Sequence, residues 1–516
     1  MARFYIENFG CRATQADGAA LERQFLDRGL ERAGAARDAE IVVLNTCTVT
    51  EGADKDARAS IRRLQRVNPD CRILVTGCYA QRAPEELAAL PGVTWVVGNS
   101  HKHQAAEIAT SSSFPSSGSS SSSSGFVPLG QLAKDQLSGD QASNVIVGDI
   151  FAHTELLAAP VFEAANERTR PNLKVQDGCD NRCSFCVIPY VRGQSRSLPR
   201  ERVIAEVRTL VEAGYREVVI SGINLGRWGW DLQGSLQPSA VSHQLSGESE
   251  GGSSVLSIVG NQRLVDLIRA ILERTSLEKL RISSVEPMDW SDELIGLVAA
   301  SGRIAKHAHV PMQSGSDAVL RRMHRRYRPW HYREKILKIR KAMPEAAIGA
   351  DVMVGFPGET EAEFDETRRM IEELPFTYLH VFTYSARPGT PAAEQPGQVP
   401  VAVARERNRV LREIASGKKA AFMRSLVGTV VEAITLQSGG AEFTEALTDN
   451  YLKMKISGHH EANRWMDVKV EGMNGEMLLG NPVVGPALEP ALSEQMWNVV
   501  RAAPPTVVTQ GSEQTH

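Results

Sequence analysis

The chain contains 516 residues, of which 42% are hydrophobic and 23% are charged, a composition typical of globular proteins. A chain of this length is expected to form about three domains. Its mean hydropathy is −0.23, and the absence of any run of about 18 apolar residues in the sequence excludes a membrane-spanning helix. The net charge of −3 excludes a uniformly basic nucleic-acid-binding protein but allows local basic patches.

The first residues lack the apolar segment of a signal peptide, and we therefore expect the protein in the reducing cytoplasm. Disulfide bonds are not expected in that compartment. The seven cysteines are interpreted instead as metal ligands or catalytic thiols, and the odd number fits six ligands and one spare residue.

Residues 1–108 alternate short apolar runs with helix-length segments, which predicts an α/β domain. The expected strands are Phe4–Ile6, Ile41–Leu44, Ile73–Thr76 and Trp95–Val97, and the expected helices are Asp17–Arg32 and Ala53–Val67. Residues 109–154 are interpreted as a linker or insertion. Within it, 11 of the 15 residues 111–125 are serine, so this segment has too few apolar groups to offset the entropy of ordering the chain.

The alternation of strands and helices resumes over residues 155–400, which predicts a parallel barrel or partial barrel. The expected strands are Glu217–Ile220, Leu280–Ser283, Ala308–Pro311, Gly349–Val354 and Tyr378–Phe382, with helices such as Arg200–Ala213 and Leu264–Arg274 between them. Residues 231–257 are rich in Ser, Gly and Gln and contain no Lys or Arg. They are interpreted as a surface insertion that leaves the topology unchanged.

The C-terminal part changes character after a basic helical linker, residues 401–420, which belongs to the expected helix Val401–Arg424. Short strands over residues 421–488 then predict a small β-barrel. The expected strands are Thr429–Ile434, Leu452–Ile456, Met466–Val470 and Met477–Leu479. Residues 489–516 are expected to form a frayed polar tail.

Cys179, Cys183 and Cys186 lie in one loop directly after an expected strand. Three thiolates at this spacing can bind three irons of a [4Fe-4S] cluster and leave the fourth iron open. An open iron can bind the amino and carboxylate groups of S-adenosylmethionine, and one-electron reduction of that sulfonium yields an adenosyl radical. Zinc and inert thiols are the alternatives, but structural zinc needs four ligands, and no histidine lies between His153 and His243.

Cys11, Cys47 and Cys78 each follow a strand-like run. Because the carboxyl ends of parallel strands lie along one edge of a sheet, these three thiols can converge on a second cluster. The alternative is three ordinary buried cysteines, although a glycine or small polar residue beside each thiol favours the cluster. Cys71 lies at the other end of the strand that leads to Cys78, roughly 20 Å or more away, and is expected to stand outside the site.

Six motifs occur in a fixed order along the chain: Phe9–Cys11, Asn45–Thr50, Thr76–Gln81, the cysteine loop with Ile188–Gly193, Gln313–Ser316 and Gly355–Thr360. With these motifs the chain resembles the radical S-adenosylmethionine methylthiotransferases over almost its whole length. Asn45–Thr50 with Ala53–Lys55, Cys78–Gln81 and Arg281–Pro287 are most similar to the branch that acts on threonylcarbamoyladenosine in tRNA.

The resemblance implies an α/β fold in three parts: an N-terminal methylthiotransferase domain, a partial (βα)6 radical barrel and a small RNA-binding β-barrel of the TRAM type. It implies two [4Fe-4S] clusters, an auxiliary one on Cys11, Cys47 and Cys78 and the catalytic one on Cys179, Cys183 and Cys186. The chain departs from the family pattern in the serine tract, the insertion 231–257 and Glu445–Leu447.

The activity that the resemblance implies is methylthiolation of C2 of threonylcarbamoyladenosine at position 37, with S-adenosylmethionine as methyl donor and radical source. The implied partners are the tRNA anticodon stem-loop, a reducing electron donor and a sulfur donor. Isopentenyladenosine in tRNA and an aspartate of a ribosomal protein are alternative substrates. A non-catalytic iron–sulfur or zinc RNA-binding protein is the alternative of another class.

Further cofactor contacts are expected where strands of the core end and in the motifs around the cysteines. These candidates are Phe185, Ser221, Gly222, Gln313, Ser314, Asp351 and Gly355. A hydrophobic plug at Phe185 and a plain turn at Gly222 are alternative interpretations.

Two basic segments are candidate RNA contacts. Arg321–Lys341 contains 10 Lys or Arg in 21 positions with Tyr327, Trp330 and Tyr332 between them, which suits phosphate contact and base stacking. The alternative is a solvated helix face that covers the barrel. The second basic run consists of Arg405, Arg407, Arg409, Arg412, Lys418, Lys419 and Arg424.

Overall fold

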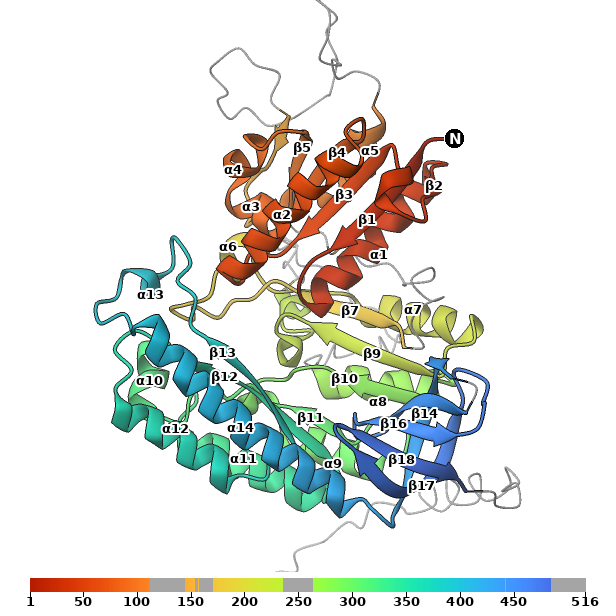
Figure 1. Ribbon diagram of the computed structural model, residues 1–516, viewed down its shortest axis with the longest axis vertical. Coiled ribbons are helices and arrows are strands. Elements are labelled where there is room, and N and C mark those ends of the chain that lie inside the picture. Colours follow the sequence, from red (N-terminus) through yellow and green to blue (C-terminus); the bar gives the residue numbers. More distant parts are fainter. Residues whose placement is uncertain (112–143, 154–155, 157–169, 235–262, 441, 484–516) are drawn as a thin grey trace, which may run out of the picture.

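The computed structural model describes residues 1–111, 144–153, 156, 170–234, 263–440 and 442–483, which form three parts (Figure 1). Most of the serine-rich segment 111–125, most of the insertion 231–257 and all of the tail 489–516 lie outside the described residues. None of the helices in the described ranges is long and apolar enough to cross a membrane.

The N-terminal part, red to orange in Figure 1, is a parallel sheet of six strands in the order β2-β1-β3-β4-β5-β6. The strands are β1 (Arg3–Asn8), β2 (Glu31–Arg32), β3 (Ile41–Thr46), β4 (Arg72–Gly77), β5 (Val93–Gly98) and β6 (Val145–Ile146). The helices are α1 (Arg12–Asp27), α2 (Glu51–Val67), α3 (Cys78–Arg82), α4 (Pro84–Ala88) and α5 (Ala105–Thr110). All residues of β3 are buried, as expected for a central parallel strand covered on both faces.

The first helix differs from the expected range Asp17–Arg32. It begins at Arg12 and ends at Asp27 because Gly29 adopts a φ of 77°, a left-handed conformation that stops a helix. Glu31 and Arg32 then pair with β1 as an edge strand.

The central part contains six parallel strands that follow one another in chain order, beginning with the pair β7 and β9. They are β7 (Asn172–Asp177), β9 (Glu217–Gly222), β10 (Lys279–Ile282), β11 (His307–His309), β12 (Ala347–Val354) and β13 (Tyr378–Thr383). The short strand β8 (Arg196–Ser197) pairs antiparallel with β7. Leu280 links β10 to the segment before β11 through hydrogen bonds with Arg303 and Ala305. The predicted α/β class and partial six-stranded barrel are confirmed.

Helices pack outside these strands and bury one large hydrophobic core. They are α7 (Arg200–Glu212), α8 (Leu264–Arg274), α9 (Asp292–Ala300), α10 (Asp317–Arg322), α11 (Pro329–Ala342), α12 (Glu361–Glu373), α13 (Pro391–Glu394) and α14 (Val401–Ser425). The short helix α6 (Ile188–Arg192) packs instead against α3 of the N-terminal part. Thr360 begins α12 with a capping box, in which its side chain accepts from Glu363 N and the Glu363 side chain accepts from Thr360 N.

The C-terminal part, blue in Figure 1, is a closed five-stranded barrel in the order β14-β15-β16-β18-β17. Its strands are β14 (Val430–Gly439), β15 (Phe443–Thr448), β16 (Lys453–Ser457), β17 (Trp465–Asn474) and β18 (Met477–Pro482). The predicted small barrel is confirmed, but the sequence analysis missed β15. Its Glu445 and Ala446 interrupt the run of β-branched and aromatic residues typical of strands, although Ala446 and Leu447 are buried in the barrel.

Candidate functional site

The loop triad, defined as Cys179, Cys183 and Cys186, lies between β7 and α6. The Asn224 side-chain amide donates to the Cys179 sulfur at 3.7 Å, and the Arg325 guanidinium donates to the Cys183 sulfur at 3.3 Å. Burial, followed by the nearby Cys183, raises the pKa of Cys186 to about 12. A bound metal must therefore displace a proton from this thiol, and the donated hydrogen bonds would stabilise the resulting thiolates.

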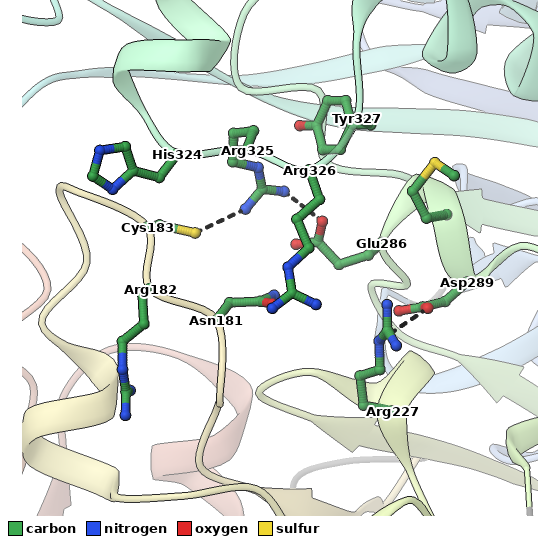
Figure 2. Close-up of a pocket in the computed structure, with 11 residues that line it drawn as sticks. Asn181, Arg182, Cys183, Arg227, Glu286, Asp289, His324, Arg325, Arg326 and Tyr327 are labelled. Atoms are coloured by element: carbon green, nitrogen blue, oxygen red, sulfur yellow. Dashed lines mark hydrogen bonds and ion pairs between the residues drawn. The ribbon is translucent and has the colours of Figure 1, made fainter.

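Arg325 joins the loop triad to the core. Figure 2 shows its guanidinium between Cys183 and the carboxylate of Glu286, with which it forms an ion pair. Arg325 is almost completely buried, so this cation of the first basic segment serves the cysteine loop and is withdrawn from any RNA.

The strand-end triad, defined as Cys11, Cys47 and Cys78, lies at the carboxyl edge of the N-terminal sheet. Asn8 of β1 pairs with Asn45 of β3, and β3 pairs in parallel with β4. The cysteine that follows each of these strands therefore lies at the same edge of the sheet. Burial, followed by the nearby thiols of Cys78 and Cys11, raises the pKa of Cys47 to about 12.

Gly10 makes this convergence possible. Its φ is 97°, and a Cβ atom there would lie 2.9 Å from the Cys47 sulfur and 2.6 Å from the Cys47 Cβ. Any other residue would therefore clash with the thiol as well as strain the backbone. The alternative of three unrelated buried cysteines does not explain this close approach, and Cys11 is moreover exposed.

A buried ion network, which the sequence analysis missed, joins the N-terminal part to the core beside the strand-end triad. It consists of Asp17 on α1, Lys102 in the short 3-10 helix η2 (Asn99–Gln104), Lys174 and Asp177 on β7, and Arg192 on α6. The Arg192 guanidinium lies 2.9 Å from Asp17 and 3.0 Å from Asp177. Three cations surround two carboxylates, which leaves the network with one excess positive charge.

A cavity of about 580 Å³ lies inside the core strands and is lined by residues of all three parts. Cys11 and Arg12 come from the N-terminal part, and Tyr451 comes from the C-terminal barrel. The remaining lining residues lie at or after the core strands and include Ser221, Gly222, Ser283, Ser284, Glu286, His307, His309, Gln313, Asp351, Tyr378 and His380. The cavity thus brings one thiol of the strand-end triad to the interior of the radical barrel.

Four of the expected cofactor contacts line this cavity: Ser221, Gly222, Gln313 and Asp351. The Ser221 hydroxyl is buried and has no hydrogen-bond partner among the described residues, so it is available to a ligand. Gly222 also lies close to Gln176. A Cβ atom at this glycine would lie only 2.8 Å from the Gln176 side-chain oxygen.

The other three expected contacts, Phe185, Ser314 and Gly355, do not belong to the lining of this cavity. Phe185 makes an edge contact with Phe356, at 6.3 Å between ring centroids. The Ser314 hydroxyl lies 3.0 Å from that of Thr367. The remaining residue, Gly355, lies against helix α14, where a Cβ atom would approach an alanine to 2.6 Å.

Two further features of the cavity were missed. His309, Asp351 and His380 bring their polar atoms within 4.8 Å of one another. Tyr451 enters the cavity from the loop after β15, with a φ of 70° and its ring 4.9 Å from that of His307. The only signal in the sequence was the departure from the family pattern at residues 445–447, just before this tyrosine.

The base-stacking interpretation of Tyr327 and Tyr332 is wrong. Both side chains are about 1% exposed, and their hydroxyls donate to the backbone oxygens of Met312 and Val310, each at 2.7 Å. Of the three aromatic residues in this basic segment, Trp330 is exposed.

Many Lys and Arg side chains of the two basic segments already form ion pairs or hydrogen bonds to the backbone. Arg322 pairs with Glu363 and Arg333 with Glu373 in the first segment. The second segment retains three exposed cations that form no ion pair with other described residues: Arg405, Arg412 and Arg424.

Two family models match parts of this chain. Residues 3–98 match the model described as uncharacterized protein family UPF0004, and residues 173–371 match the Radical SAM superfamily. The chain is 35% identical to the threonylcarbamoyladenosine tRNA methylthiotransferase MtaB of Bacillus subtilis, over 89% of this chain and 91% of that protein. The MtaB of Aquifex aeolicus is 32% identical over 90% and 99% of the two chains. The chain belongs to the radical S-adenosylmethionine methylthiotransferase family.

Relatives named for another substrate are also similar to the chain. The tRNA-2-methylthio-N(6)-dimethylallyladenosine synthase of Novosphingobium aromaticivorans is 32% identical over 84% of this chain and 87% of that protein. Among solved structures, the radical S-adenosylmethionine methyltransferase TsrM of Kitasatospora setae matches 76% of this chain and 74% of its own, with 16% identity and a TM-score of 0.47. As a member of this family, the chain is an enzyme that uses S-adenosylmethionine and an iron–sulfur cluster.

Proposed function

We propose that this enzyme methylthiolates C2 of threonylcarbamoyladenosine at position 37 of tRNA, next to the anticodon. The observation that carries the proposal is the shared cavity, in which Cys11 of the strand-end triad faces the strand ends of the radical core. The relatives named for this nucleoside, at 32–35% identity over most of the chain, support the substrate assignment.

The loop triad would hold the [4Fe-4S] cluster of the radical reaction, and the strand-end triad would hold a second [4Fe-4S] cluster. The donor sets fit, because each consists of three thiols, which can hold three irons of a cluster and leave the fourth iron open. When bound, these groups supply an adenosyl radical for hydrogen abstraction and a sulfur atom that receives a methyl group from S-adenosylmethionine.

The chain itself orients the reactants. Ser221 offers a hydroxyl that has no partner within the described part of the chain, and Gln313 and Asp351 offer polar side chains to the cofactor and the nucleoside. Tyr451 and Arg12 line the cavity where the three parts meet, with the guanidinium donating to the phenol oxygen at 2.9 Å. Holding both reactants in one site replaces random encounter with a fixed geometry.

The remaining partners follow from the reaction. A reducing electron donor must deliver the electron that cleaves S-adenosylmethionine, and a sulfur donor must restore the transferred sulfur. Arg405, Arg412 and Arg424 on α14 are exposed and lead to the small barrel, so we propose that they contact phosphates of the anticodon stem-loop.

The decisive experiment incubates the anaerobically reconstituted enzyme with dithionite, S-adenosylmethionine and a sulfide source, together with anticodon stem-loops that carry either threonylcarbamoyladenosine or isopentenyladenosine. Mass spectrometry of the digested nucleosides then measures replacement of hydrogen by a methylthio group. We expect the product on threonylcarbamoyladenosine.

Other outcomes would overturn the proposal in distinct ways. A product only on isopentenyladenosine would move the enzyme to that branch of the family. If neither RNA is modified while 5′-deoxyadenosine still forms, the substrate lies elsewhere, for example in a ribosomal protein. A chain that forms no 5′-deoxyadenosine would match the non-catalytic RNA-binding alternative.

A further inference from the structure

We propose that Arg12 binds the carboxylate of the threonyl group and thereby selects threonylcarbamoyladenosine over isopentenyladenosine. This inference rests on the proposed function and adds the residue that recognises the substrate. The carboxylate is the one charged group on the modified base, whereas the isopentenyl group is purely apolar. A residue that distinguishes the two substrates should therefore be a cation at the cavity.

Arg12 is a cation of this kind. It lines the cavity and forms no ion pair with any carboxylate of the described residues. Its guanidinium donates to the Tyr451 hydroxyl at 2.9 Å and lies 5.9 Å from the centroid of that ring. The tyrosine holds the side chain in place, while a guanidinium retains further N–H groups for a bidentate bond to a carboxylate.

The other cations near Tyr451 are already paired. The guanidinium of Arg281 lies 5.2 Å from the ring and donates to Glu217 at 2.5 Å. Arg170 lies 5.8 Å from the ring and 4.0 Å from the same carboxylate. Neither arginine lines the cavity.

Two histidines of the cavity, His307 and His380, do not replace Arg12 as the cation. Burial, followed by the nearby Arg281, holds the pKa of His307 well below its usual value, and burial also lowers the pKa of His380. These imidazoles are therefore neutral near pH 7 and act as hydrogen-bonding groups. Among the described residues that line the cavity, Arg12 is the one arginine or lysine.

The position of Arg12 suits the chemistry of the substrate. It directly follows Cys11, whose thiol lines the same cavity. In adenine, C2 and C6 both neighbour N1, so a substituent on N6 lies close to the carbon that receives the methylthio group. A nucleoside that presents C2 to the strand-end triad consequently presents its N6 substituent to the residue beside Cys11.

The polar lining around this point suits the rest of the threonylcarbamoyl group. Asp351 lies 3.3 Å from the His309 ring and can accept from an N–H of the substrate. The Ser283 hydroxyl is buried without a partner among the described residues, and Ser284 bonds His309 at 2.6 Å. An isopentenyl group would leave these polar atoms unsatisfied, which is an effective way to reject a substrate.

The test measures binding of the reconstituted enzyme to three anticodon stem-loops, which carry threonylcarbamoyladenosine, its methyl ester or unmodified adenosine. The wild type should bind the acid about 10- to 100-fold more tightly than the ester, the range expected for a hydrogen bond to a charged group. Arg12→Met should bind acid and ester equally, because methionine offers no N–H group to the carboxylate. Arg12→Lys should restore part of the preference.

Arg170→Met is the matched control, because Arg170 contacts the same tyrosine ring outside the cavity, and this variant should keep the preference for the acid. Iron and sulfide per chain are measured for every protein, since Arg12 neighbours Cys11. If Arg12→Met loses the same factor on acid and ester, Arg12 does not bind the carboxylate and the inference is wrong. The proposed function fails separately, when the wild type does not modify the threonylcarbamoyl RNA at all.

Discussion

The two cysteine triads of this enzyme are built in opposite ways. The loop triad comes from a single segment, residues 179–186, and the core supplies hydrogen bonds to its sulfurs from Asn224 and Arg325. The strand-end triad takes one thiol from each of three parallel strands and lies against the core near Arg192.

The difference lies in what each triad needs in order to form. A loop needs only its own backbone and the barrel that carries it. The strand-end triad needs the register of the whole N-terminal sheet and the docking of that sheet on the core through the buried ion network. Damage at the interface should therefore disturb the strand-end triad and spare the loop triad.

The largest expected effect comes from removal of either triad. The wild type should bind about eight irons after anaerobic reconstitution, and the triple variant Cys179→Ala, Cys183→Ala, Cys186→Ala should retain about four. The corresponding variant of Cys11, Cys47 and Cys78 should also retain about four. Iron and sulfide analysis measures these values.

The two variants also distinguish the functions of the two triads. Only the protein with an intact loop triad should still cleave S-adenosylmethionine to 5′-deoxyadenosine. If the loop-triad variant retains no iron although the wild type binds about four, the strand-end triad holds no second cluster and the methylthiotransferase mechanism must be reconsidered.

The next effect concerns the interface. Asp17→Asn removes a fully buried carboxylate and leaves Lys102, Lys174 and Arg192 short of one counter-charge. Breaking a buried ion pair from one side costs about 3–5 kcal/mol, and urea denaturation should show a loss of this size. Iron should be lost from the strand-end triad first.

Asp27→Asn is the matched control on the same helix. Asp27 is exposed and pairs with Arg23 at 3.0 Å, so its loss should change the free energy of unfolding by no more than about 1 kcal/mol. Equal effects of the two substitutions would contradict the structural role of the network.

The acid stability of the protein tests the same network. Burial acts to raise the pKa of Asp17, but Lys102, Lys174 and Arg192 outweigh burial and hold this pKa below its ordinary value. The carboxylate therefore stabilises the folded protein above about pH 4, the pKa expected in the unfolded chain, and this contribution is lost as the pH falls.

The free energy of unfolding should fall by about 1.4 kcal/mol per pH unit for each such carboxylate below about pH 4. Asp17→Asn should show a shallower acid dependence, because one proton fewer binds on unfolding. Denaturation at several pH values gives both slopes. Parallel curves for wild type and variant would contradict the lowered pKa.

Much of this architecture could be predicted from local patterns. The βα alternation specified the parallel sheets, and the spacing of the loop triad was visible because one loop contains all its ligands. The positions of Cys11, Cys47 and Cys78 after strands were sufficient to anticipate a common edge, since parallel strands release their ends on the same side.

The features that the sequence did not reveal depend on partners in other parts of the molecule. The partners of Lys174 lie on the N-terminal helix and on its own strand, and Tyr451 reaches the cavity from the last domain. Tyr327 illustrates the same difficulty. A tyrosine in a basic segment suggests base stacking, but the structure shows that its hydroxyl donates to a buried backbone oxygen.

The smallest effect on iron content is expected for Cys71→Ser. Cys71 is 8% exposed and packs in the hydrophobic core at the start of β4, whereas Cys78 follows the end of the same strand. The substitution replaces a weakly polar thiol with a hydroxyl in an apolar site, so the free energy of unfolding should fall by about 1–3 kcal/mol. Iron content should remain that of the wild type, because the strand separates this residue from the cluster edge. A loss of iron in a protein that still unfolds cooperatively would show that Cys71 is a ligand. The division of the other six cysteines into two triads would then be wrong.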